Sequence, residues 1–488
     1  METEKPARER DTEDRRREGI ESKVEGFNER GRRAIRDRGL HDAIEHFTKK
    51  SVAGRNAVLD ALSDAPELRE RAYRIKQETM ANLDRYLEQM ADAVEERDGK
   101  VFFAKDGEDA VRYVGELARR RGAKVITKSK SMATEEIELN RRLEDDYADL
   151  GLEIVETDLG EWIAQLADDH PSHIVGPILH MNRKQVAEIL SGVAGERLPP
   201  NVEDLTRFAR KRLRKKFLTA DIGMSGANFG VAETGTICTI TNEGNGRLVT
   251  SVPPVHVVVM GIEKVIPRFE DLSVFVRLLA RSGTGQKLTV YTNFITGPGG
   301  EGELDGAEEM HLILLDNGRS ELLGTEFEEA LYCIRCGACL NVCPVYRQTG
   351  GHAYGSTYSG PIGAVITPLL KGDEEAKDLP HASSLCGACW EACPVGIPLH
   401  DLLLKLRNRQ AEKGITGKAQ RAAFKVFEST MKRPALYRIS GKAGRTVQKP
   451  FSGDSARRLP GPLSGWTDSR DLPPLADKSF RELWKEGI

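Results

Sequence analysis

Seven of the eight cysteines in this chain lie in two short runs, and each run ends in a Cys-Pro pair. Two, two and three residues separate the cysteines of the first run, and two and three separate those of the second. This spacing is typical of cubane iron–sulfur clusters, because three closely spaced thiolates wrap one cluster while the fourth reaches another. Structural zinc usually uses paired CxxC units and has no need of the proline. The two runs therefore predict iron–sulfur clusters and a redox role: Cys333, Cys336, Cys339 and Cys343, then Cys386, Cys389 and Cys393.

The seven cysteines are one short of two complete ligand sets. Ser383 stands where the second run would have its first cysteine, and His381 and Ser384 lie nearby. We expect two clusters, both [4Fe–4S] unless the second is [3Fe–4S] or has a non-cysteine fourth ligand. The eighth cysteine, Cys238, lies in a Thr-rich segment and is expected to be a small buried hydrophobe. By the crossover rule, the first cluster takes Cys333, Cys336, Cys339 and Cys393, and the second takes Cys343, Cys386 and Cys389.

Size and charge limit the classes of protein to which the chain can belong. Its 488 residues predict two or three domains, and a net charge of -3 gives no general attraction for nucleic acid. No apolar run approaches the roughly 20 residues that span a bilayer. The charged N-terminus has no apolar core of a signal peptide. Ligand thiolates must stay reduced, so we expect a cytoplasmic protein, with peripheral attachment to the membrane through partners left open.

Composition shifts along the chain predict five segments. A charged lead-in that we expect to be disordered precedes a helical segment, which Pro66 should interrupt. Short β-rich runs then alternate with helical stretches, as in an α/β domain with a parallel sheet. The cysteine runs lie 42 residues apart, so their module is larger than a minimal ferredoxin and should be helical and ferredoxin-like, followed by a helical C-terminal extension. The expected bounds are 1–40, 41–96, 97–320, 325–400 and 401–488.

The α/β domain should contain at least eight strands. We find no GxGxxG between a strand and a helix and no Walker A motif, so dinucleotide or P-loop binding has little support. The four expected helices between the early strands cover 109–120, 134–143, 162–166 and 183–190. The strands are expected at 101–103, 124–126, 152–155, 173–175, 237–241, 255–260, 288–291 and 310–315.

One loop of this domain is a candidate anion site. Lys128, Ser129 and Lys130 follow an expected strand and precede an expected helix, where backbone N–H groups and two cations could hold a phosphate or carboxylate. A solvated loop is the alternative, and it is the interpretation that we favour. The basic stretch 207–216 has an apolar stripe and predicts an amphipathic helix whose basic face is exposed to solvent.

Several stretches of the chain together form a recognisable pattern. They are the first cysteine run as far as Arg347, and the stretches Gly350–Gly360, Ser383–Cys389, Pro398–Asp401, Gly226–Thr236 and Asn242–Asn245. These stretches resemble the lactate-utilisation protein B family, and the resemblance covers about residues 70–488. The seven cysteines with the gap at Ser383 agree with the pattern of that family.

The resemblance implies a fold and a role. The α/β segment would be a lactate-utilisation (LUD) domain, similar to the glucosamine-phosphate isomerase, ribose-phosphate isomerase and CoA-transferase group. The family is implicated in growth on L-lactate, with a second iron–sulfur protein and a second LUD-domain protein as companions. Similarity to CoA transferases suggests a catalytic carboxylate at Glu243, but a turn of Asn and Gly residues is the interpretation that we favour there.

Three functions remain open at this point. The leading one is an electron carrier in the oxidation of L-lactate to pyruvate, within a multi-protein complex that has its own redox donor and acceptor. The first alternative is a catalytic subunit that binds a hydroxy acid or CoA-like ligand in the LUD domain. The second is an iron–sulfur redox sensor, and the lack of a basic DNA-binding module counts against it. The sequence identifies no catalytic residue, so whether the chain is itself an enzyme stays open.

Overall fold

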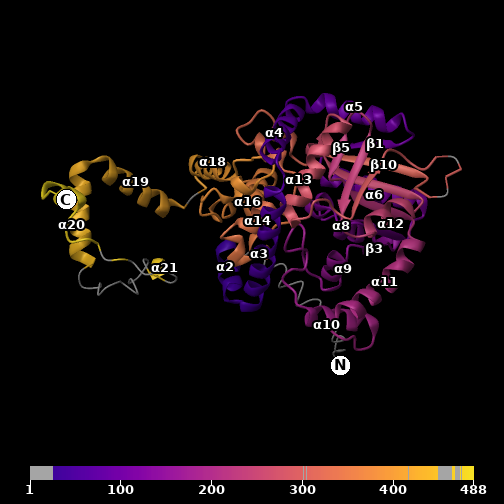
Figure 1. Ribbon diagram of the computed structural model, residues 1–488, viewed down its shortest axis with the longest axis horizontal. Coiled ribbons are helices and arrows are strands. Elements are labelled where there is room, and N and C mark those ends of the chain that lie inside the picture. The colour runs from indigo at the N-terminus through magenta and orange to yellow at the C-terminus, as the bar shows by residue number, and fades with distance from the viewer. Residues whose placement is uncertain are drawn as a thin grey trace. The chain divides into compact units, whose positions relative to one another are not determined.

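The computed structural model describes residues 26–300, 302–303, 305–415, 417–448, 464–467, 473 and 475–487. The chain divides into two compact units, one ending at Gln410 and the other beginning at Ala411. The first unit holds the α/β domain and the cysteine runs (Figure 1).

Within the described residues, four helices precede the first strand. The expected charged lead-in, 1–40, lies partly outside the described residues, but from Phe27 onward it is helical rather than disordered. The physical reason is tertiary packing: the Phe27 ring lies 5.1 Å from the ring of Tyr354, and Arg30 Nε donates to Ala353 O at 2.9 Å. Pro66 lies in the first turn of a helix, after the interruption that the sequence predicts. The helices are α2 (Phe27–Arg36), α3 (Arg38–Asp60), α4 (Ala65–Ala81) and α5 (Leu83–Glu95).

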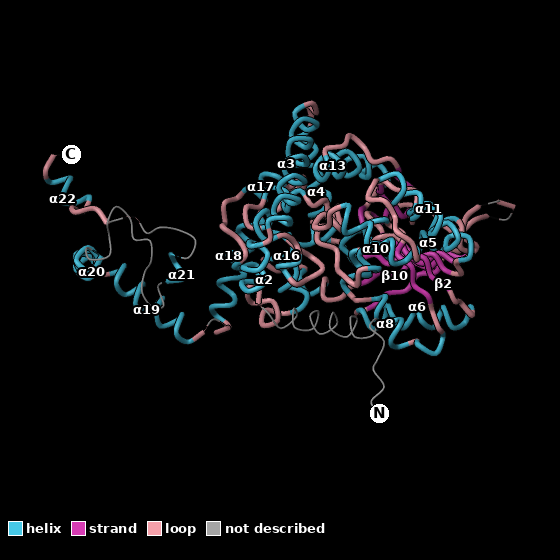
Figure 2. The backbone as a smooth tube through the Cα atoms, turned by 90° about the horizontal axis from the view of Figure 1, so that it is seen from below, coloured by secondary structure: helices cyan, strands magenta, loops and turns pink. Residues whose placement is uncertain are grey.

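A six-stranded parallel sheet forms the centre of the α/β domain, as the alternating pattern predicts. Its strand order is β1-β10-β7-β4-β2-β3, and every neighbouring pair is parallel. Helices cover both faces, with α6 (Gly107–Arg121) and α8 (Leu139–Asp146) on the same side (Figure 2). The strands are β1 (Lys100–Ala104), β2 (Val125–Lys128), β3 (Glu153–Glu156), β4 (Ile222–Gly226), β7 (Val255–Gly261) and β10 (Glu309–Leu315).

The predicted strand at 173–175 is wrong, because this segment is a loop that pairs with no strand. It packs on the cysteine module instead, where Tyr346 Oη donates to Ser172 O at 2.8 Å and His173 Nε2 lies 3.1 Å from Asn341 Oδ1. The predicted strand at 288–291 is displaced, since β9 begins only at Tyr291.

A second sheet has the order β8-β5-β6-β9. Cys238 lies in its strand β6 and is fully buried, as expected. The strands of this sheet are β5 (Phe229–Val231), β6 (Thr236–Thr241), β8 (Val265–Ile266) and β9 (Tyr291–Ile295). The remaining helices of the domain are α7 (Met132–Glu136), α9 (Leu159–Leu166), α10 (Arg183–Ala194), α11 (Val202–Thr219), α12 (Asn245–Ser251) and α13 (Leu272–Thr284).

The cysteine module is built from short helices and shares a hydrophobic core with the α/β domain. Residues of α4, β7 and the second sheet pack in one continuous cluster with Tyr346, Ile362 and Leu403 of the module. Because this core is continuous, the cysteine module packs directly against the α/β domain rather than being joined to it only by a linker. Its helices are α14 (Ala338–Val342), α15 (Tyr346–Thr349), α16 (Gly360–Lys371), α17 (Ala388–Ala392) and α18 (Leu399–Glu412).

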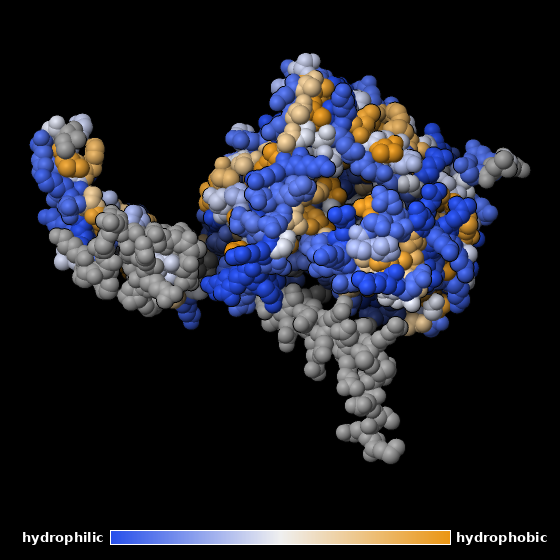
Figure 3. Space-filling view, turned by 60° about the horizontal axis from the view of Figure 1, so that its bottom comes forward, coloured by the Kyte–Doolittle hydropathy of each residue, from blue (hydrophilic) through white to orange (hydrophobic). Residues whose placement is uncertain are grey.

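The described part of the second unit is mostly helical. Phe424, Phe427 and Met431 expose apolar side chains along its first helix. Among the described residues, no helix has the length and apolar character needed to cross a membrane. The face of the molecule seen in Figure 3 is mostly hydrophilic, with scattered hydrophobic patches. The helices of this unit are α19 (Lys418–Lys432), α20 (Pro434–Gln448), α21 (Ser464–Thr467) and α22 (Phe480–Lys485).

Candidate iron–sulfur site

The first cysteine run folds into a tight loop followed by one turn of helix. Arg335 and Gly337 both have a left-handed backbone, with φ of 59° and 77°. Such a backbone is strained for Arg335 and easily adopted by Gly337. Helix α14 begins directly after Gly337, and the chain becomes extended again at Cys343. Burial raises the pKa of the Cys339 thiol, and the charges of Cys333 and Cys336, brought close by this path, raise it further. Burial also raises the pKa of Cys343, but the cysteine whose charge adds to it is Cys386 of the second run.

The second run repeats this backbone 50 residues further along the chain. Leu385 and Gly387 are left-handed, with φ of 56° and 83°, at the positions that correspond to Arg335 and Gly337. Helix α17 corresponds to α14, and the two helices pack against each other. The two runs are therefore two copies of one structural unit.

Ser383 occupies the place in the second copy that Cys333 has in the first. The Arg335 N–H donates to Cys333 Sγ at 3.4 Å, and the Leu385 N–H donates to Ser383 Oγ at 3.1 Å. The same backbone donor thus faces a thiol in one copy and a hydroxyl in the other. This matched hydrogen bond agrees with the cysteine spacing, which predicts that Ser383 takes the place of a cysteine ligand.

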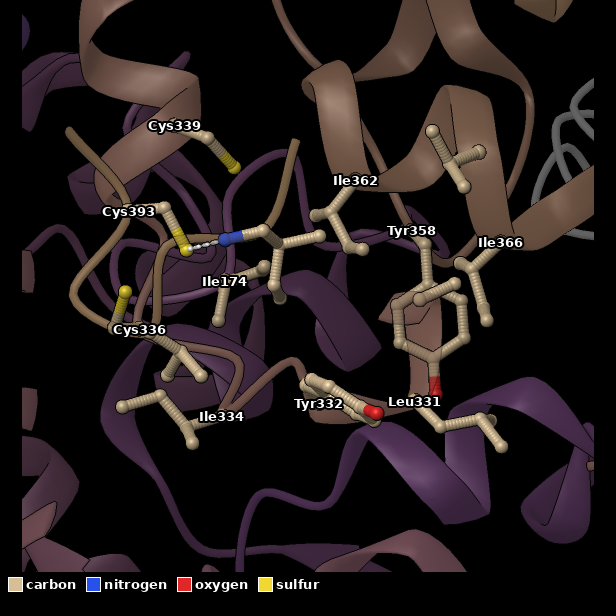
Figure 4. Packing of buried hydrophobic residues seen from close by; sticks show 14 of the residues in the cluster. Ile174, Leu331, Tyr332, Ile334, Cys336, Cys339, Tyr358, Ile362, Ile366 and Cys393 are labelled. Atoms are coloured by element: carbon tan, nitrogen blue, oxygen red, sulfur yellow. Dashed lines mark hydrogen bonds between the residues drawn. The ribbon is translucent and has the colours of Figure 1, made fainter. Parts of the chain in front are cut away.

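Cysteines from both copies meet in a first group. Burial raises the pKa of the Cys336 thiol, and the charges of Cys393 and Cys333 raise it further. Figure 4 shows Cys336, Cys339 and Cys393 gathered around one space, with the Ile397 N–H donating to Cys393 Sγ at 3.4 Å. Buried thiolates crowded without a countercharge are costly, and bound iron would supply that charge.

The other cysteines form a second group. Burial raises the pKa of the Cys389 thiol to about 12, with Cys343 as the strongest neighbouring charge and Cys386 as a further one. Cys386 is exposed, whereas Cys389 and Cys343 are buried. All eight cysteines are free thiols, so no disulfide competes with cluster binding. The two groups are neighbours, because the charge of Cys389 also raises the pKa of the Cys339 thiol.

A buried ionic network joins the first cysteine run to the α/β domain. Arg319 Nη2 lies 2.7 Å from Glu136 Oε2, and Arg319 Nε lies 2.7 Å from Glu263 Oε2. Glu263 also pairs with Arg335 at 3.4 Å. Burial alone would raise the pKa of Glu263, but Arg319 and Arg335 hold it at about 2. The guanidinium of Arg335 also lies 4.6 Å from the Tyr358 ring centroid. Sequence reasoning missed this network. The one feature of the sequence that points to it is the basic residue Arg335 inside the first cysteine run.

The predicted anion-binding loop lies at the carboxyl end of β2. Lys128 is fully buried, and its Nζ lies 2.7 Å from both Glu135 Oε1 and Glu156 Oε1. Burial lowers the pKa of Lys128, but these carboxylates raise it above its usual value. The Ser129 N–H is already bonded to Met224 O at 2.9 Å.

Lys130 Nζ lies 3.1 Å from Glu161 Oε1. Both cations of the loop therefore face carboxylates already, and an anion would have to displace one of these partners. Anion binding by Lys128, Ser129 and Lys130 stays a prediction.

Glu243 lies near this loop. Its Oε2 accepts from the Leu159 N–H at 3.1 Å, at the start of α9. Burial and the charge of Asp158 raise the pKa of Glu243 to about 7. A carboxyl group that titrates near neutral pH suits proton transfer.

Three family models match the chain in succession. The LUD domain matches residues 87–315, the 4Fe-4S dicluster domain matches 329–397, and the lactate utilisation protein B C-terminal model matches 405–487. The "Lactate utilization protein B" of Bacillus cytotoxicus is 48% identical over 462 residues, which cover 94% of this chain and 97% of that protein.

The chain belongs to the lactate utilisation protein B family. The protein of that name from Shouchella clausii is 47% identical over 461 residues, covering 94% of this chain and 96% of the relative. The dicluster match agrees with the iron–sulfur cofactor that the cysteine spacing predicts. A crystal structure of a DUF162 family protein from Deinococcus radiodurans aligns over 48% of this chain and 98% of that one. Its identity is 12% and its TM-score 0.25, too low to support a fold assignment.

Proposed function

We propose that the chain is an iron–sulfur electron carrier in L-lactate utilisation, passing electrons during the oxidation of L-lactate to pyruvate within a multi-protein complex. The observation that carries this proposal is the meeting of seven free thiols in two neighbouring groups. Family membership supports the lactate pathway, since relatives of nearly the same length are named for it.

The ligand sets that we propose cross between the two runs. The electrostatic neighbours of the Cys336 thiol include Cys393, and those of Cys389 include Cys343. Each of these pairs joins residues from different runs, which supports the crossover. The first cluster is assigned to Cys333, Cys336, Cys339 and Cys393, and the second to Cys343, Cys386 and Cys389.

We propose further that Ser383 faces the open corner of the second cluster. Its Oγ takes the same backbone hydrogen bond that Cys333 Sγ takes in the first copy. A serine oxygen there can serve as the fourth ligand, or can border a three-iron cluster. In either case the set carries one thiolate fewer, and the reduction potential should be higher than that of a four-cysteine set.

The two clusters differ in exposure to solvent, and this difference suggests which of them exchanges electrons with a partner. Cys386 is exposed, and the neighbouring Trp390 is 43% exposed. The first group is deeper and lies near the cations of Arg55 and Arg335. The second cluster is therefore the better candidate for direct electron exchange with a partner. The first cluster is the better candidate for holding electrons within the chain.

The companions in this proposal are a second iron–sulfur protein and a second LUD-domain protein. The complex would operate in the cytoplasm, with any membrane contact made through partners. The LUD domain would share the fold of the isomerase and CoA-transferase group, and would serve as a docking or ligand-binding platform.

The alternative is a catalytic subunit, and the raised pKa of Glu243 is the observation that favours it. The two functions are separated by assaying the isolated, cluster-loaded protein with L-lactate and an artificial electron acceptor. An electron carrier shows no turnover alone but is reduced once the companion proteins are added. Turnover by the isolated protein, abolished by Glu243→Gln, would support the catalytic subunit instead.

A further inference from the structure

Three metal-binding side chains converge at the junction of the α/β domain and the cysteine module. Asp169 and His180 come from the loops on either side of 173–175, and His352 follows the first cysteine run. One ligand atom from each residue lies within 4.8 Å of the other two. His180 Nε2 lies 3.0 Å from Asp169 Oδ2, and the rings of His180 and His352 are 4.5 Å apart between centroids.

Both ring nitrogens of His180 have polar neighbours. Its Nδ1 lies 2.8 Å from Ser172 Oγ, and its Nε2 lies 3.0 Å from Asp169 Oδ2. Ser172 Oγ also lies 3.1 Å from Pro177 O. In the tautomer in which Nδ1 donates to Ser172 Oγ, the lone pair of Nε2 is on the side of the Asp169 carboxylate, and the two groups can bind one cation together.

The ring of His352 is held in a similar way. Its Nε2 lies 2.7 Å from the carbonyl oxygen of His170, which can only accept. Its second nitrogen therefore carries the free lone pair. Metal-bound imidazoles usually direct their other N–H to a carbonyl, a carboxylate or a hydroxyl in this manner. Asp169 completes the set with its carboxylate, whose Oδ1 lies 3.8 Å from His352 Nε2.

A cavity of about 220 Å³ adjoins two of the three residues. His180 and His352 line it, so an ion that they hold could be reached by a small molecule. Arg30, Arg33 and Asp37 line the same cavity, which therefore has charged groups of both signs in its wall.

We propose that Asp169, His180 and His352 bind one divalent transition-metal ion of the zinc type, separate from the iron–sulfur clusters. Two imidazoles and one carboxylate suit zinc and its neighbours in the first transition row, whereas magnesium and calcium prefer oxygen ligands alone. Three protein ligands leave a fourth position open. That position takes water or a small molecule from the cavity. The ion joins the two modules, since its ligands come from both.

Zinc uptake by the full-length, cluster-loaded protein tests this proposal. Equilibrium dialysis against Zn²⁺ under anaerobic conditions should show one zinc per chain with iron and acid-labile sulfide unchanged. Zinc X-ray absorption should show only nitrogen and oxygen neighbours at about 2.0–2.1 Å, and no sulfur at about 2.3 Å. Asp169→Asn, His180→Ala and His352→Ala should each weaken zinc binding by at least about 100-fold, more than loss of an outer hydrogen-bond partner usually costs.

His46→Ala is the matched control, because His46 is exposed on α3 and outside the set. It should bind zinc as the unaltered protein does. Asp169→Asn keeps the size of the side chain, and retained iron shows that the variant is folded. No zinc uptake by the unaltered protein, sulfur neighbours in the absorption spectrum, or unchanged affinity in an iron-loaded Asp169→Asn protein would each overturn the proposal.

Discussion

Replacing Ser383 with cysteine should lower the reduction potential of the second cluster. The side chain at this position faces the same kind of backbone donor as Cys333 does, at 3.1 Å for the hydroxyl and 3.4 Å for the thiol. The slightly longer distance fits the larger sulfur atom, so the loop should accept the exchange without a change of path. Ser383→Cys would then complete a fourth thiolate and add one negative charge beside the cluster.

The size of the effect depends on how well solvent screens this charge. A unit charge about 4 Å away is worth about 1 kcal/mol in water and about 4 kcal/mol at an effective dielectric constant of about 20. For one electron, these limits correspond to about 45 mV and about 170 mV, at about 59 mV for each 1.36 kcal/mol. Cys386 is exposed and Cys389 is buried, so the environment is intermediate. We expect a decrease of about 100 mV, within these limits.

Redox titration followed by EPR measures both the potential and the cluster type. Any [3Fe–4S] signal should be replaced by that of [4Fe–4S] in the Ser383→Cys protein. Ser384→Cys is the control, because Ser384 is exposed and corresponds to Ile334, which is no ligand in the first copy. An unchanged potential and cluster type in Ser383→Cys, or an equal shift in Ser384→Cys, would refute the reasoning.

Three further predictions concern the ligand sets, the iron content and the ionisation of one buried carboxyl group. Cys393→Ala should remove the EPR signal of the cluster that the first run holds, and Cys343→Ala should remove that of the cluster held by the second run. If each substitution instead removed the signal of the cluster held by its own run, the crossover would be wrong. Anaerobically purified protein should contain about seven to eight irons per chain with matching acid-labile sulfide, and elemental analysis that finds mainly zinc without sulfide would contradict the whole site.

Burial raises the pKa of Glu161 to about 7. Its contribution to stability is therefore fully present below about pH 4.5 and is lost as the pH rises through 7, by up to about 3 kcal/mol. The melting temperature of Glu161→Gln relative to the unaltered protein should rise between pH 5 and pH 8, and a pH-independent difference would be evidence against this ionisation.

The parallel sheet could be predicted from the alternation of β-rich and helical stretches, but strand β4 could not. Gly223 and Gly226 resemble a loop in the sequence. The structure explains Gly223, because a Cβ there would overlap the carbonyl oxygen of Val249 in α12. The close packing of α12 on β4 is a tertiary requirement that local patterns do not carry. The strand predicted at 173–175 is wrong for a related reason. This β-branched segment has no strand beside it in the fold, so it packs as a loop.

The cysteines could be predicted as ligands because their spacing is local, whereas the charges around them come from distant parts of the chain. Glu263 and Arg335 are 72 residues apart, and Arg319 and Glu136 are 183 apart. Asp169 and His352 are equally remote in sequence and meet only because the 173–175 loop packs on the cysteine module. No residue pattern along the chain indicates such pairings.

The central claim is that electrons from L-lactate pass through the clusters of this chain. Freeze-quench EPR on the assembled complex, mixed anaerobically with L-lactate, tests it most directly. We expect the signals of both clusters to change to those of the reduced state at least as fast as the complex turns over. We also expect Cys389→Ala to slow the delivery of electrons to the external acceptor. Clusters that stay oxidised while lactate is converted to pyruvate at the full rate would contradict electron transfer through this chain.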